Sequence, residues 1–145
     1  MTELGYDPDM SEGLKVELRM RLSAGDAHYG GSLVDGAHGL EIFGDIVTEL
    51  AVRTDGDEGL FAGYEKVEFL APMHAGDFVR ATGTIVRMGN TSRTVDLELW
   101  KEITARADVG ESAADLLEPA QLVTRARGTY VVKKEFHRGA GGHGA

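Results

Sequence analysis

Hydrophobic and charged residues alternate with a period of two over residues 14–22. This period places every apolar side chain on one side of an extended chain, so it predicts a strand with one buried face. Similar strand patterns recur at Tyr64 to Leu70, Phe78 to Met88, Thr91 to Ile103 and Gln121 to Phe136. The dipeptide Gly89-Asn90 lies between two of these runs and predicts a hairpin turn.

One long segment, from about Leu33 to Val52, has the period of a helix instead. Its predicted apolar face consists of Leu33, Ala37, Leu40, Phe43, Val47 and Leu50. Glu41, Asp45 and Glu49 form an acidic stripe on another face, spaced by four residues. The acidic, alanine-rich stretch Thr104 to Pro119 is weakly patterned, so we expect a long loop there, in which Ala113 to Leu117 could form a helical turn.

The predicted order is a strand, one long helix and then four strands joined mainly by hairpins. Such an order predicts an α+β domain in which a curled antiparallel sheet wraps around one long central helix, the hotdog arrangement. We expect this domain to cover residues 14–136. The polar start, Met1 to Gly13, is expected to be a flexible leader, and the glycine-rich tail, His137 to Ala145, is expected to be disordered.

Charge and composition narrow the function classes. The chain of 145 residues carries a net charge of −9, which argues against a nucleic-acid surface, and it contains no cysteine, which excludes disulfides, zinc–thiolate sites and thiol nucleophiles. No stretch approaches the roughly 20 apolar residues of a membrane span. The acidic, polar start does not resemble a secretory signal. We therefore expect a soluble, cytoplasmic protein.

A first candidate site precedes the predicted helix and combines glycines with polar residues. Its candidate ligand-binding residues are Asp26, His28, Tyr29, Gly30, Gly31 and Ser32. Adjacent glycines allow the backbone to approach a ligand, and a helix start offers unpaired N–H groups that would polarise a carbonyl oxygen. The alternative is an ordinary glycine-rich connection, capped by Ser32 or Asp35.

Asp45 and Glu49, one helical turn apart, form a second candidate site. Two such carboxylates could divide the work of holding an ammonium group and moving a proton. The alternative is a solvated acidic face shared with Glu41. Against it, we expect no lysine or arginine to pair with the stripe, and we expect a central helix to have little solvated surface.

His28 and His38 are candidate proton carriers because imidazole titrates near neutral pH. Neither histidine has a neighbouring pattern that suggests a metal site, so a polar turn residue is the simpler interpretation of both. The chain contains no Gly-x-Ser-x-Gly elbow, no phosphate-binding loop and no dinucleotide-binding fingerprint.

Seven short motifs follow one another between residues 26 and 93. They are Asp26-Ala-His-Tyr-Gly-Gly, Phe43-Gly-Asp, Thr48-Glu-Leu, Asp55-Gly-Asp, Val67-Glu-Phe-Leu-Ala-Pro, Ala75-Gly-Asp and Gly89-Asn-Thr-Ser-Arg. Their order and spacing resemble the acyl-CoA ammonia-lyases, the family of the 3-aminobutyryl-CoA ammonia-lyase of lysine fermentation and a relative acting on β-alanyl-CoA. The resemblance covers roughly Leu14 to Lys101 and is closer to the 3-aminobutyryl-CoA member.

The resemblance implies a hotdog fold, a homodimer that assembles into a hexamer, and an active site between subunits. It also implies the reversible elimination of ammonia from a 3-aminoacyl-CoA to give the 2-enoyl-CoA. Neither a metal nor an organic cofactor is implied, since coenzyme A is part of the substrate.

The resemblance also assigns residues. Asp45 and Glu49 match the family's Gly-Asp-x-x-Thr-Glu-Leu segment, which implies the acid/base and ammonium-binding roles for them. Gly30 and Gly31 would face the thioester. Asn90, Ser92 and Arg93 would contact the pantetheine or phosphate part of coenzyme A.

Two positions depart from the family pattern. Asparagine is usual where this chain has Ser32, and arginine where it has His38, which bears on substrate choice and affinity for coenzyme A. The stretch Thr104 to Pro119 and the glycine tail have no clear counterpart.

Three other functions are compatible with the predicted fold. An acyl-CoA thioesterase would use Asp45 alone to activate water, although Gly44 stands where many thioesterases carry glutamate. A hydratase or dehydratase usually needs a histidine with an acid. The third is a CoA-binding domain without catalysis.

Overall fold

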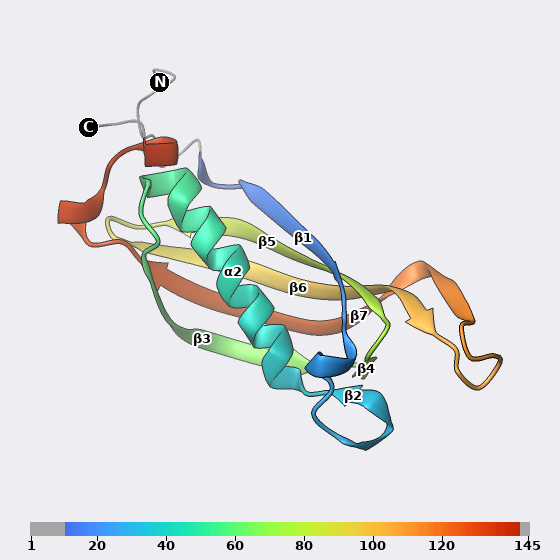
Figure 1. Ribbon diagram of the computed structural model, residues 1–145. Helices are drawn as coiled ribbons and strands as arrows, with labels where there is room; N and C mark the ends of the chain where they lie inside the picture. Colours follow the sequence, from blue (N-terminus) through green and yellow to red (C-terminus); the bar gives the residue numbers. More distant parts are fainter. Residues whose placement is uncertain (1–10, 143–145) are drawn as a thin grey trace.

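The computed structural model describes residues 11–142, and its main elements are one helix and one large sheet (Figure 1). They are β1 (Lys15–Arg21), β2 (Leu33–Val34), α2 (Gly36–Asp55), β3 (Leu60–Phe69), β4 (Met73–His74), β5 (Phe78–Met88), β6 (Ser92–Ala105) and β7 (Ala114–Val131). Short 3-10 turns are η1 (Ala24–Asp26), η2 (Gly30–Ser32), η3 (Lys134–Phe136) and η4 (Ala140–Gly142). Five antiparallel strands pair in the order β1-β5-β6-β7-β3, so β1 and β3 are the edge strands of this sheet. The helix crosses one face of the sheet, which confirms the predicted hotdog fold.

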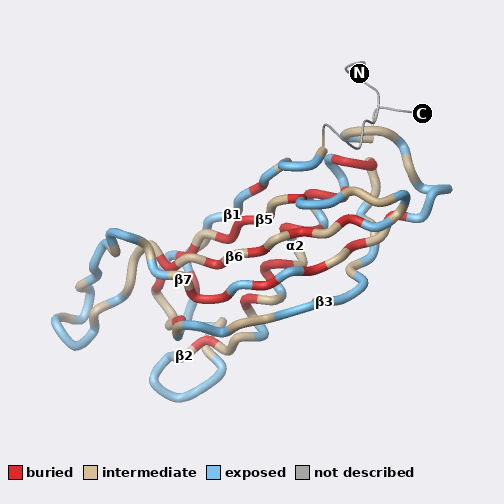
Figure 2. Tube along the Cα trace, turned by 180° about the vertical axis from the view of Figure 1, so that it is seen from behind, coloured by how far each residue is buried: buried red, intermediate tan, exposed pale blue. Residues whose placement is uncertain are grey.

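The core lies between α2 and the middle of the sheet (Figure 2). Phe43, Ile46 and Leu50 of α2 are fully buried there, against strand residues such as Leu97. Gly83 on β5 lets the helix come close, because a Cβ atom at that position would collide with the side chain of Ile46. One face of the helix is therefore held tightly against the sheet.

The predicted helix is displaced by three residues at each end. Leu33 and Val34 do not begin the helix; they form β2 and pair with β4. At the other end the helix continues to Asp55 and stops at Gly56, which adopts a left-handed conformation with φ of 67°. This displacement leaves Ala37 exposed instead of buried.

The predicted strands agree with the structure to different degrees. The strand Phe78 to Met88 is confirmed at both ends. The strand predicted to begin at Tyr64 begins at Leu60, four residues earlier. The last strand ends at Val131 instead of Phe136, because the chain turns into η3.

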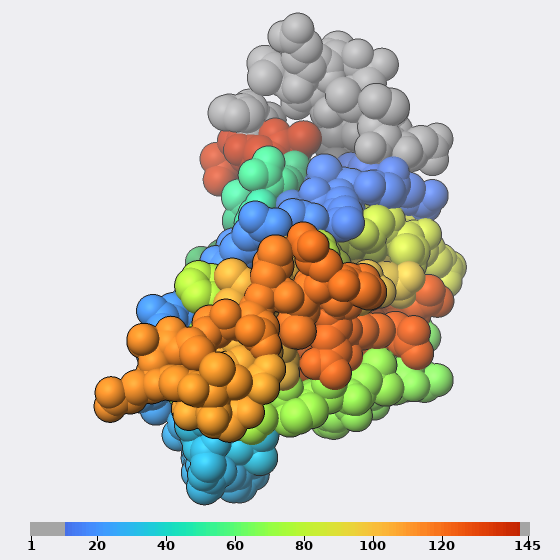
Figure 3. All heavy atoms as spheres, turned by 90° about the vertical axis from the view of Figure 1, so that its right-hand side faces the viewer, coloured from blue at the N-terminus to red at the C-terminus, as the bar shows by residue number. Residues whose placement is uncertain are grey.

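The expected loop over Thr104 to Pro119 is wrong, and so is its suggested helical turn. β6 continues to Ala105 and β7 begins at Ala114, and these two residues pair across the hairpin. The connection is residues 106–113, braced by ion pairs from Arg106 to Asp108 and Asp115. Figure 3 shows the resulting arm, in orange, projecting from the body of the molecule.

Part of the glycine-rich tail contacts the end of α2. The backbone N–H of Arg138 donates to the carbonyl of Asp55 at 2.9 Å, and its guanidinium donates to the carbonyls of Gly56 and Gly142. Residues 1–10 of the expected leader and 143–145 of the expected tail lie outside the described residues. No helix within residues 11–142 is both long and apolar enough to cross a membrane.

Candidate active site

The glycine-rich segment forms a tight exposed turn before α2. The backbone N–H groups of His28 and Tyr29 both donate to the carbonyl of Leu33, at 3.0 and 3.1 Å. Gly31 and Ser32 follow each other in the left-handed region, with φ of 68° and 60°. A serine in that conformation is strained, and such strain is typical of functional turns. The six candidate residues of this segment are thus brought together at one end of the helix.

Asp26 and His38 connect this turn to the helix. The carboxylate of Asp26 accepts a 2.8 Å hydrogen bond from the backbone N–H of Ser23. That bond is the main reason why the pKa of Asp26 lies below its usual value, with a smaller contribution from the nearby His38. The ring of His38 lies 3.7 Å from Asp26 and 3.8 Å from Glu41. The simpler interpretation of His38 as a polar turn residue is wrong in its location, because His38 lies in the first turn of α2, between these two carboxylates.

A hollow of about 390 Å³ opens at the start of α2. It is lined by Tyr29, Leu33, Val34, Asp35, Gly36, Ala37, Phe69, Ala71, Pro72, Met73, Val123 and Thr124. Asp35 is the residue before the first turn, and its side chain makes no capping bond. The N–H groups of the first turn therefore lie at an open, mostly apolar cavity, where a polarisable oxygen would be stabilised.

Asp45 and Glu49 lie further along α2, on the side away from the sheet. Asp45 is exposed, and Glu49 is one-third exposed and paired with Arg53 at 2.8 Å. The expectation that the stripe has no basic partner is thus wrong, because the helix extends past Val52 and brings Arg53 one turn from Glu49. The expectation of little solvated surface is also wrong for a single chain, since the sheet covers only one side of the helix.

Arg93 lies at the opposite end of α2 and is completely buried. Its guanidinium makes two hydrogen bonds to the carboxylate of Asp55, at 2.9 and 3.1 Å, and one to the carbonyl of Gly89. Asp55 also accepts a hydrogen bond from Thr54, whose hydroxyl lies 3.0 Å from that of Tyr130. Arg93 therefore does not fit the predicted contact with pantetheine or phosphate. Asn90 and Ser92, in the turn above it, are exposed.

The predicted site residues therefore fall into three groups along one helix. The helix has 20 residues, so its two ends lie about 30 Å apart, and Asp45 lies about 14 Å from the first residue. A single chain brings the glycine turn close to the helix start. It does not bring the acidic pair or the Asn90 turn there.

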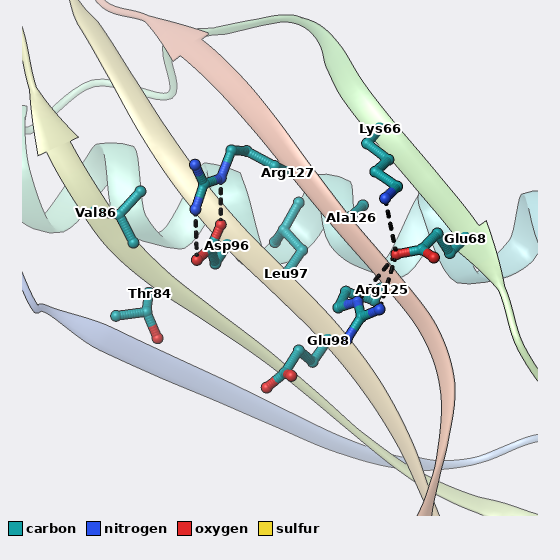
Figure 4. Close-up of a pocket in the computed structure, with 10 residues that line it drawn as sticks. All are labelled: Lys66, Glu68, Thr84, Val86, Asp96, Leu97, Glu98, Arg125, Ala126 and Arg127. Atoms are coloured by element: carbon teal, nitrogen blue, oxygen red, sulfur yellow. Dashed lines mark hydrogen bonds and ion pairs between the residues drawn. The ribbon is translucent and has the colours of Figure 1, made fainter.

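A second hollow, of about 510 Å³, lies on the other face of the sheet (Figure 4). Its charged side chains largely neutralise one another: Arg127 binds Asp96, and Arg125 binds Glu68. No predicted site residue lines this hollow. No group of three histidine, aspartate or glutamate side chains within residues 11–142 is arranged to hold a metal ion.

Known proteins resemble this chain in both sequence and structure. It is 52% identical to the 3-aminobutyryl-CoA ammonia lyase of Acetoanaerobium sticklandii over 125 residues, which cover 86% of this chain and 99% of that protein. The β-alanyl-CoA:ammonia lyase of Clostridium propionicum superposes with a TM-score of 0.86 at 37% identity, over 92% of this chain and 98% of that one.

More distant relatives share the fold alone. The family model of the thioesterase superfamily matches residues 41–107. A hexameric hotdog fold thioesterase of Campylobacter jejuni superposes with a TM-score of 0.66 at 20% identity, over 85% of this chain and 86% of that one. The extent and identity of the first two matches are decisive, and this chain belongs to the family of acyl-CoA ammonia-lyases.

Proposed function

We propose that this protein catalyses the reversible elimination of ammonia from a 3-aminoacyl-CoA such as 3-aminobutyryl-CoA. The product is the 2-enoyl-CoA. The observation that carries the proposal is the pair Asp45 and Glu49 on the exposed side of α2, in a chain 52% identical to a 3-aminobutyryl-CoA ammonia lyase. We further propose a cytoplasmic location, from the composition and the polar start of the chain, and a role in amino-acid fermentation, from the sequence resemblance.

The hollow at the helix start supplies the first requirement of this chemistry. A proton next to a thioester is only weakly acidic, so the enolate formed by its removal must be stabilised. The N–H groups of Gly36 and Ala37 belong to the first helical turn, where N–H groups lack intrahelical partners. A thioester oxygen at this position would lie at the positive end of the helix dipole, which would stabilise the negative charge of the enolate.

The two carboxylates supply the second requirement. One takes the proton from the carbon next to the thioester, and the electrons of that C–H bond form the enolate. The enolate then collapses to the 2,3 double bond as the C–N bond breaks and ammonia leaves with its electron pair. The second carboxylate binds the substrate ammonium group and keeps it protonated, so that the nitrogen leaves as neutral ammonia while the first carboxylate retains the proton taken from carbon.

A second copy of the chain would bring the two requirements together. Within one chain the acids lie too far from the helix start, because each residue of the helix adds about 1.5 Å along its axis. The acids lie on the uncovered side of α2, and the edge of β3 is open, so a two-fold pair could place the acids of one copy over the hollow of the other. We propose such a dimer, assembled further into a hexamer.

Three exposed cations near the Asn90 turn are suitable partners for the phosphates of coenzyme A. Arg87 precedes the turn on β5. Lys133 and Lys134 follow Val132, whose N–H donates to the carbonyl of Thr91 at 2.9 Å. This proposal replaces the role that the sequence assigned to the buried Arg93.

The test is the reverse reaction, in which crotonyl-CoA and ammonium are mixed with the protein and the loss of enoyl absorbance is followed. Asp45→Asn and Glu49→Gln should each lower this rate by about 10²–10⁴-fold, because each removes a carboxylate that moves a proton or binds the ammonium group but keeps the side-chain shape. Glu41→Gln, on the same stripe, is the matched control and should retain the wild-type rate.

Two outcomes would contradict the proposal. The first is full activity of both variants. The second is release of free coenzyme A, detected with a thiol reagent, without ammonium-dependent loss of the enoyl signal, which would indicate a thioesterase. Co-purified mixed oligomers of Asp45→Asn and Gly31→Val chains provide a separate check, since a site shared between copies should recover part of the activity that each variant lacks.

A further inference from the structure

The aromatic ring of Phe69 lies directly over the first turn of α2. A Cβ atom built on Gly36 would be 2.5 Å from Cε1 and 2.8 Å from Cδ1 of this ring. Such distances are far below van der Waals contact, so any side chain at position 36 would force the ring to move. Gly36 therefore allows Phe69 to occupy the space beside the helix start.

Phe69 is a wall of the hollow and not a part of the core. Phe69 is 59% exposed, and Tyr29, another residue of the same lining, is 57% exposed. The backbone of Phe69 is fixed, because it is the last residue of β3 and pairs with Thr124 of β7. The ring thus projects from a rigid strand into a region where little else restrains it.

The position of the ring matters for an acyl chain. A thioester oxygen bound by the first-turn N–H groups would direct the rest of the acyl group into the hollow, whose other walls are mainly apolar: Leu33, Ala71, Pro72, Met73 and Val123. Asp35 is the one charged residue of the lining, and the apolar walls fit the hydrocarbon part of an acyl chain. The ring of Phe69 fills part of this space next to the helix start, so it limits the length of chain that fits.

We propose that Phe69 is the specificity-determining residue that restricts the enzyme to short acyl chains of about four carbons, and that Gly36 is required to hold its ring in place. This inference rests on the proposed function, since it takes the ligand to be a CoA thioester bound at the helix start. It predicts opposite effects for two neighbouring substitutions. Phe69→Ala enlarges the hollow, whereas Gly36→Ala pushes the ring into it.

The experiment measures binding and does not depend on catalysis. Dissociation constants of butyryl-CoA, hexanoyl-CoA, octanoyl-CoA and free coenzyme A are determined by titration calorimetry for each variant. The wild type should bind butyryl-CoA more tightly than octanoyl-CoA, and Phe69→Ala should reduce this ratio by about tenfold or more, the usual size of a discrimination based on a few methylene groups. Gly36→Ala should weaken all three acyl-CoAs, most strongly the longest, with the affinity for free coenzyme A changed least.

The matched control is Phe136→Ala. Phe136 is also an exposed phenylalanine, 48% exposed, but it lies in η3 beyond the other end of the sheet. This variant should keep the wild-type ratio. Circular dichroism and gel filtration of each variant separate a change in the hollow from a loss of fold or assembly.

The outcomes separate this inference from the proposed function. An unchanged butyryl-to-octanoyl ratio in Phe69→Ala, in a protein that adds ammonium to crotonyl-CoA, overturns the role of Phe69 alone. A shifted ratio in a protein without ammonia-lyase activity supports the role of Phe69 and contradicts the proposed reaction. A chain that binds no acyl-CoA contradicts both.

Discussion

The two ends of α2 are built in opposite ways. At its start lies an open hollow whose lining includes the exposed Tyr29 and Phe69, and two residues in succession, Gly31 and Ser32, have positive φ. At its end, Arg93 and Asp55 are fully buried and bound to each other, and residues of the tail lie against Gly56. Polar groups are frequent at both ends, but the Arg93–Asp55 pair is closed to a ligand, whereas the turn before the helix start is exposed.

This difference explains why the sequence was misleading at one end. Arg93 lies beside Asn90 and Ser92 in a motif that resembles the family pattern, and an arginine in such a motif suggests phosphate binding. Its true partner, Asp55, lies 38 residues earlier in the chain. A polar motif can therefore be kept for stability, and burial distinguishes that role from binding.

The largest expected effect tests the closed end. Arg93→Leu should lower the free energy of unfolding by about 3–5 kcal/mol, because Asp55 would remain as an unpaired buried charge. Urea unfolding followed by circular dichroism measures this change. The matched control is Arg127→Leu, which removes an exposed pair with Asp96 and should cost far less stability, because water screens exposed ion pairs. Equal costs for the two variants, or a loss of affinity for coenzyme A in Arg93→Leu without a loss of stability, would contradict the assignment.

A smaller effect tests the strained turn at the open end. Asparagine tolerates the left-handed region better than serine does, so Ser32→Asn should raise the free energy of unfolding by about 1 kcal/mol. Ser112→Asn is the control, since Ser112 lies in the arm and lacks a positive φ. An increase in both variants, or in neither, would mean that backbone strain at Ser32 is not the cause.

The smallest effect tests the link from this turn to the helix. The hydrogen bond from the Ser23 N–H lowers the pKa of Asp26 in the folded state, so Asp26 stabilises the fold above its usual pKa of 3.8, and this contribution is lost as the pH falls through its folded-state value. The difference in unfolding free energy between the wild type and Asp26→Asn should therefore shrink as the pH falls from 5 toward 3. Urea titrations at each pH measure this difference. A difference that does not change with pH would show that the ionised carboxylate of Asp26 does not stabilise the fold.

Much of the fold could be predicted from the sequence, because the buried face of a strand recurs every two residues and that of a helix about every 3.6 residues. The strand Phe78 to Met88 is bounded by clear turn residues, and the structure confirms both ends. The arm around Arg106 was missed because its strands lie beyond the helix and have little apolar alternation. The backbone ladder joins these strands, and one ion pair, from Arg106 to Asp115, spans the hairpin.

The candidate site was predictable in part. The glycine turn was found because glycines before a helix form a local pattern. The hollow, by contrast, depends on Phe69, which lies 33 residues after Gly36 in the sequence. The path of β3 places the two residues in contact. No periodicity links two such residues, and the same is true of Asp26 and His38.

The open edge of β3 has a consequence for how assembly can be followed. Within the described chain β3 pairs only with β7, so alternate amide groups of β3 point away from the sheet. In an isolated protomer these amides would exchange their hydrogens with water rapidly, and a strand added to that edge would slow them. Deuterium uptake along β3, read against uptake along the other edge strand β1, would thus report which edge a neighbouring protomer covers and at what protein concentration it does so.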